Sequence, residues 1–182
     1  MRIRLALALF LIALTPGALT AMAQTKKTKH NHKSHSHGDA KLDIAVDGKT
    51  VSFDLESPGD VIFGFERRPK NDEEKAKIAN EMTRLNDKAS ELFIFPADAG
   101  CTLAEKDIEA DQAAETSKDK ASDHADVLAT YTFNCTGDLA GKKIATGLFK
   151  AWPRLKNLKV QILGSSSQKG VTLKADVTDL AL

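Results

Sequence analysis

The chain has 182 residues, of which 26 are basic and 25 acidic, and aromatic residues make up 5%. The balanced charge gives no general attraction to nucleic acid or anionic membranes, and so few aromatics argue against a stacking platform for single-stranded nucleic acid. The length suits one domain with a sizeable core. We therefore expect no nucleic-acid partner.

The first 23 residues have the pattern of a secretory signal peptide. Two arginines precede the apolar run Leu5–Leu14, and Ala21-Met22-Ala23 fits the small-x-small cleavage rule. The apolar run is too short to span a bilayer. We expect cleavage before Gln24 and no membrane insertion of the exported chain. The alternative is an uncleaved anchor.

Histidines gather just after this signal. Four of the five lie within ten residues: His30, His32, His35 and His37. Neutral imidazole is the commonest protein ligand for zinc, copper and nickel, so the cluster predicts metal capture outside the cytoplasm. Residues 24–38 have no apolar side chain to bury and are expected to form a disordered arm. The alternative is a solvated low-complexity linker with no metal role.

The fifth histidine, His124, is followed two residues later by Asp126 and preceded by Asp123. Carboxylates beside a histidine favour a role as a ligand or in support of one, although a lone histidine in a polar loop is usually just exposed. Asp39, at the end of the arm, is equally ambiguous.

Alternating apolar residues predict the first strands. Residues 40–46 and 51–55 flank Asp47-Gly48, which is a strong hairpin signal. Residues 61–65 form an apolar run that is either a buried strand or a packed loop. A helix is then expected from an N-cap at Asn71, with a capping box to Glu74; its apolar face would carry Ile78, Met82, Leu85, Ala89 and Leu92.

Further elements complete an α+β pattern. Strands are expected at Cys101–Glu109 and Val127–Cys135, with a solvated acidic loop at 110–126 between them. A second helix is expected at Ile144–Trp152, followed by strands over 158–162 and 171–177. The order ββ-α-ββ-α-ββ predicts a single domain at 39–182, a largely antiparallel sheet with two helices on one face.

Cys101 and Cys135 are the only cysteines. An even number in an exported chain predicts a disulfide, worth about 4 kcal/mol for a loop of about 35 residues on the chain-entropy model. The alternative is a Cys/His metal site.

Enzyme motifs fail on inspection. The segment Gly137–Lys143 resembles a P-loop but lacks one spacer residue and has lysine where serine or threonine should hold magnesium. Neither a G-x-S-x-G elbow nor an H-E-x-x-H motif occurs. We expect the protein not to be an enzyme.

Several short motifs follow one another along nearly the whole exported chain. They are His35-Ser36-His37-Gly38 with 40–45, Leu55–Gly59, Gly64-Phe65-Glu66 with Pro69, Ala99–Cys101, His124-Ala125-Asp126, Tyr131–Cys135 and Leu148–Pro153. In this order they resemble the ZrgA family, periplasmic proteins linked to zinc uptake in Gram-negative bacteria. The resemblance implies zinc binding in the periplasm and transfer towards an ABC-type zinc importer or its solute-binding protein.

The H-x-H-G element of the family carries over onto His35 and His37, and its H-x-D element onto His124 and Asp126. Two departures stand out. Relatives often have a long His/Asp-rich insert between the cysteines, where residues 111–123 contain no histidine here. They also often have a histidine directly after the G-F-E element, where this chain has Arg67.

The resulting hypothesis is one zinc site shared by His35, His37 and His124, with Asp126 or Asp39 as fourth ligand. His30 and His32 would act as auxiliary collectors. Binding needs neutral imidazoles, so affinity should fall as pH drops through about 6.5. Two alternatives stay open: copper or nickel buffering, because imidazole sites bind copper(II) more tightly than zinc, and a structural or adaptor domain with an incidental histidine arm.

Overall fold

The computed structural model describes residues 37–111, 125–139, 141–164 and 167–182. The predicted signal peptide, most of the arm and His124 lie outside these ranges. None of the helices in the described ranges is long and apolar enough to cross a membrane.

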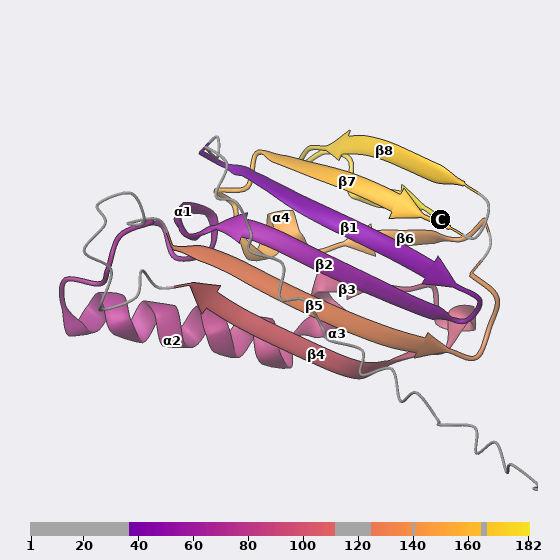
Figure 1. Ribbon diagram of the computed structural model, residues 1–182, viewed down its shortest axis with the longest axis horizontal. Coiled ribbons are helices and arrows are strands. Elements are labelled where there is room, and N and C mark those ends of the chain that lie inside the picture. The colour runs from indigo at the N-terminus through magenta and orange to yellow at the C-terminus, as the bar shows by residue number, and fades with distance from the viewer. Residues whose placement is uncertain (1–36, 112–124, 140, 165–166) are drawn as a thin grey trace, which may run out of the picture. The chain divides into compact units, whose positions relative to one another are not determined.

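A six-stranded sheet forms the framework of the domain (Figure 1). The strands in spatial order are β4 (Cys101–Asp111), β5 (Asp126–Cys135), β2 (Thr50–Pro58), β1 (Asp39–Asp47), β7 (Asn157–Leu163) and β8 (Gln168–Leu173). All neighbours are antiparallel except β1 and β7, which run parallel. The predicted α+β class with a largely antiparallel sheet is confirmed.

Only one face of this sheet is buried. Leu42 and Ile44 in β1 are buried while their neighbours Lys41, Asp43 and Ala45 are exposed, and β2, β5 and β7 repeat the alternation. The period of two places the apolar set on one face, where the core lies. The predicted hairpin is confirmed: Asp47 pairs with Thr50 across a turn that contains Gly48, whose φ is +57°.

Four helices of the described residues and a second sheet complete the core. The helices are α1 (Gly59–Ile62), α2 (Asp72–Asp87), α3 (Ala89–Leu92) and α4 (Leu148–Ala151), with a 3-10 turn at Ala97–Ala99. The second sheet has the order β3 (Phe93–Ile94), β6 (Lys143–Thr146) and β9 (Asp179–Ala181). Tyr131 of β5 donates its hydroxyl to the Leu85 carbonyl oxygen at 2.9 Å, which fixes α2 against the sheet.

The predicted helix at Ile144–Trp152 is wrong in its first half. Ile144 lies in β6, and helical structure is restricted to the single turn of α4. Gly147 separates the two because its backbone packs on α3: its N–H donates to the Leu92 carbonyl at 2.9 Å, and a Cβ there would lie 2.0 Å from the Glu91 oxygen.

Three other boundaries differ from the sequence-based expectation. The apolar run 61–65 is neither a strand nor only a loop, because its first residues end α1. The last strand, predicted over 171–177, ends early: β8 stops at Leu173, Lys174 and Val177 form an isolated bridge, and the separate strand β9 comes after the predicted range. The long helix is likewise divided into α2 and α3, separated by Lys88.

The disulfide prediction is confirmed. Cys101 begins β4 and Cys135 ends β5, and the two face each other in register with 3.9 Å between their Cα atoms. The bond joins the edge strand to its neighbour at one end of the sheet, and no described cysteine is free.

Candidate metal centre

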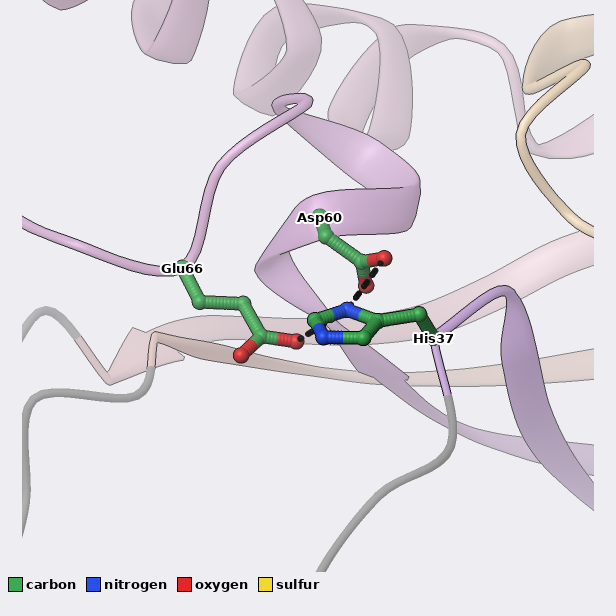
Figure 2. A group of neighbouring side chains, drawn as sticks. All are labelled: His37, Asp60 and Glu66. Atoms are coloured by element: carbon green, nitrogen blue, oxygen red, sulfur yellow. Dashed lines mark hydrogen bonds and ion pairs between the residues drawn. The ribbon is translucent and has the colours of Figure 1, made fainter.

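Three potential metal ligands meet beside the start of β1 (Figure 2). His37 lies in the turn before β1, Asp60 lies in α1, and Glu66 follows α1 in the segment that leads to α2. One ligand atom from each of the three lies within 4.8 Å of the others. The group therefore joins the end of the histidine-rich arm to the connection between β2 and α2.

At the end of β2 the backbone of Gly59, the first residue of α1, lies close to the backbones of Ala125 and Phe65. The Gly59 N–H donates to the Ala125 carbonyl at 2.6 Å. A Cβ on Gly59 would lie 2.7 Å from the Ala125 oxygen and 2.9 Å from the Phe65 oxygen, so only glycine fits. The N–H groups of Phe63 and Gly64 donate to the Gly59 carbonyl and close the turn.

The next residues return the chain towards Asp60. Gly64 has a φ of +86°, a conformation that L side chains rarely adopt, and it reverses the chain after α1. Glu66 is then held by its backbone, since its carbonyl accepts the Ala125 N–H at 2.8 Å. Beyond it, Arg67 donates two hydrogen bonds of 2.7 Å to Glu74 at the start of α2. Both ends of this segment are therefore fixed.

The imidazole of His37 lies between the two carboxylates (Figure 2). Its Nδ1 is 3.1 Å from Asp60 Oδ2 and 3.7 Å from Glu66 Oε1. The His37 side chain is 78% exposed, whereas those of Asp60 and Glu66 are 18% and 17% exposed. The carboxylates thus form the floor of the group, and the imidazole covers them on the solvent side.

One oxygen of this floor supports a ligand-binding role. Asp60 Oδ1 is buried and has no hydrogen-bond partner among the residues that the structure describes. A buried carboxylate oxygen without a partner is costly, and a cation is one of the few partners that offset the cost. Zinc accepts histidine nitrogen and carboxylate oxygen, so the donor set fits this ion.

The three side chains line an open hollow of about 460 Å³. The remaining lining residues are Gly38, Gly64, Phe65, Arg154 and Lys156. Three protein ligands leave at least one position of a tetrahedral zinc ion open to solvent or to another ligand, an arrangement that permits exchange.

The structure places two sequence-predicted ligands outside this group. Asp39 accepts a 2.8 Å hydrogen bond from Asn157 and lies 3.1 Å from Lys159 Nζ. The hydrogen bond from Asn157, assisted by Lys159, holds the pKa of Asp39 below its usual range despite the opposing effect of burial. Asp126 is buried at the start of β5, in register with Pro58.

The other predicted ligands, His30, His32, His35 and His124, lie outside the described residues. Ala125 directly follows His124 and is hydrogen-bonded to both Gly59 and Glu66. Ala125, the residue next to His124, therefore connects through its backbone to the two segments that carry Asp60 and Glu66.

Sequence reasoning missed Asp60 and Glu66 as candidate ligands. Both lay in motifs already singled out, Ser57–Asp60 as turn chemistry and Gly64-Phe65-Glu66 as a family element. The available signal was an acidic residue within two positions of a glycine at each end of a short apolar run, Asp60 after Gly59 and Glu66 after Gly64. It is a weak one, because acids beside glycine are common in ordinary turns.

Comparison with protein-family models matches residues 34–182 to the family described as ZrgA family zinc uptake protein. A search among curated proteins found no match to the chain. The family match spans all three candidate ligands, both cysteines and every strand of the two sheets.

Proposed function

The chain belongs to the ZrgA family of zinc uptake proteins, and from this premise we propose that it is a non-enzymatic periplasmic protein that captures Zn²⁺ through His37, Asp60 and Glu66. The observation that carries the proposal is the convergence of these three side chains, together with the second oxygen of Asp60, which is buried and has no described partner. Export by the N-terminal signal would bring the site into contact with periplasmic zinc.

The arm extends the proposal. His30 and His32 would collect ions, and His35, which lies two residues before His37, is a candidate for an open coordination position. His124 is another, because its neighbour Ala125 is hydrogen-bonded to Glu66. Asp39 and Asp126 stay alternative ligands that a rearranged arm could recruit.

Release follows from the same geometry. Zinc is a labile ion, and an acceptor can replace its ligands stepwise when one position is open and one ligand is exposed. His37 is the exposed ligand. We assign the acceptor role to an ABC-type zinc importer or to its solute-binding protein.

Calorimetric zinc titration of the chain that begins at Gln24 tests the site. Asp60→Asn keeps the shape of the side chain but removes its charge, and we expect at least about tenfold weaker binding, or roughly 1.4 kcal/mol. Asp54→Asn is the matched control, because Asp54 is exposed on β2 and belongs to no described ligand group. Equal affinities of the wild type and Asp60→Asn would overturn the assignment.

Growth under zinc chelation tests the biological role. A strain that lacks the protein should grow poorly with a zinc chelator present and recover with the wild-type chain or Asp54→Asn. Asp60→Asn should not restore growth. Full rescue by Asp60→Asn at equal periplasmic abundance would contradict a role of this site in zinc acquisition.

A further inference from the structure

Two cationic side chains lie beside the proposed zinc ligands. Arg154 and Lys156 line the same hollow as His37, Asp60 and Glu66. The stem of Lys156 lies against Gly38, where a Cβ would be 3.0 Å from its side-chain carbons. A site built only to attract a dication would not have two cations in its wall, since like charges repel at short range.

A third cation, Lys77, lies close to Arg154 beside Gly64. The point that a Cβ of Gly64 would occupy lies 3.0 Å from Lys77 Nζ and 3.3 Å from Arg154 Nε. Lys77 comes from α2 and Arg154 from the turn after α4, so two distant elements bring their positive groups together at a residue without a side chain. Neither group has an ion pair with a carboxylate of the described residues.

The charge balance of the hollow changes when metal binds. Without metal, the negative charges of Asp60 and Glu66 oppose the positive charges of Arg154 and Lys156. A bound Zn²⁺ would neutralise the two carboxylates and leave the cations uncompensated. An anion is the species that would restore the balance, and guanidinium and ammonium groups hold carboxylates through charge-assisted hydrogen bonds.

The size of the hollow allows such a ligand. A volume of about 460 Å³ is many times the roughly 30 Å³ share of one water molecule, so it exceeds what a zinc ion and its water require. We infer that the site binds zinc together with a small carboxylate chelator, which supplies the open coordination position and whose remaining carboxylates contact Arg154, Lys77 and Lys156. This inference rests on the proposed zinc site and names the form in which the ion is held there.

Equilibrium dialysis with radiolabelled citrate as the probe tests the inference, with zinc measured in both chambers. The wild-type chain should retain citrate only when zinc is present, in about one equivalent per zinc ion. The double variant Lys77→Gln/Arg154→Gln should lose this retention by at least about tenfold. Lys169→Gln removes an exposed cation on β8, outside the hollow, and should retain citrate like the wild type.

A second readout separates this inference from the proposed zinc site. In citrate-free buffer the double variant should bind zinc more tightly than the wild type, because two repelling charges are gone, whereas general damage to the fold would weaken binding. When zinc and citrate are both supplied, retention of zinc but not of citrate would overturn the inference and leave the zinc site standing. Citrate retention without zinc would also overturn it. Because free citrate itself binds zinc, retention of neither when both are supplied would overturn only the inference, whereas no retention of zinc in citrate-free buffer would refute the zinc site and the inference together.

Discussion

The backbone N–H of Ala125 donates to the carbonyl oxygen of Glu66 at 2.8 Å. Through this bond the start of β5 holds the segment that presents a proposed zinc ligand. The Ala125 carbonyl in turn accepts the Gly59 N–H at 2.6 Å, next to Asp60. One residue thus fixes the two carboxylate-bearing segments relative to each other, although both lie about sixty residues earlier in the chain.

Gly59→Ala should disturb this junction. The added Cβ would lie within 3.0 Å of two backbone oxygens that cannot move independently, so we expect a loss of about 1–3 kcal/mol in unfolding free energy and weaker zinc binding. Urea unfolding and zinc titration measure the two effects. Gly170→Ala on β8 is the matched control, because its Cβ would meet only one atom, at 4.0 Å. Equal behaviour of the two variants would contradict the described packing.

His124→Ala tests whether the histidine before Ala125 takes part in the zinc site. In buffer without a chelator we expect zinc affinity to fall by at least about tenfold, because the imidazole that would fill the open coordination position is lost. Calorimetric titration measures the change. An unchanged titration curve would show that His124 is a bystander and that the remaining ligands bind alone.

The sequence was enough to predict most strands of the six-stranded sheet but only one residue of the candidate metal centre, His37. Alternating runs around Asp47-Gly48 predicted the β1–β2 hairpin correctly, because local turn chemistry and a period of two suffice for it. The parallel pairing of β1 with β7 joins residues more than a hundred positions apart, such as Asp39 and Asn157, and no local pattern encodes it. Gly147 divided a predicted helix because of its contact with Glu91, which is likewise distant in sequence.

The candidate site shows the same limit. His37 was predicted from the local density of histidines, which is visible in sequence. Asp60 and Glu66 become partners of His37 only through the backbone junction at Ala125. Asp39 was considered as a ligand because it follows the histidine-rich arm, but its carboxylate contacts Asn157 and Lys159 instead.

Glu74 should make stability depend on acidic pH. Its hydrogen bonds from Arg67, together with one from the Lys70 backbone, lower the pKa of Glu74 from 4.5 to about 2. Because the folded-state pKa is the lower one, this contribution is fully present above about pH 4.5 and is lost as pH falls through about 2. Unfolding free energy should therefore fall more steeply over this window in the wild type than in Glu74→Gln. A titration midpoint of Glu74 near 4.5 by NMR would refute the described ion pair.

Removing the disulfide should destabilise the chain without changing its fold. Cys101 and Cys135 are 34 positions apart, and the chain-entropy model gives a loss of about 4 kcal/mol for Cys101→Ala/Cys135→Ala. Denaturant unfolding measures this loss. The native protein, denatured without reductant, should show no free thiol, and two reactive thiols would contradict the bond.

Tyr131→Phe should cost about 1 kcal/mol of unfolding free energy, because the buried Leu85 carbonyl loses the hydroxyl donor. Burial also raises the pKa of Tyr131 well above its usual range, so the hydroxyl keeps its proton. Urea unfolding measures the effect, and the dependence of the unfolding free energy on urea concentration should stay unchanged. An unchanged midpoint would argue against this contact between α2 and β5.

Anomalous diffraction at the zinc edge, on crystals of the chain that begins at Gln24 grown with zinc, tests the central claim most directly. We predict a zinc ion about 2.0–2.2 Å from a ring nitrogen of His37 and from carboxylate oxygens of Asp60 and Glu66. Zinc bound only elsewhere, with His37 still hydrogen-bonded to Asp60, would contradict the account.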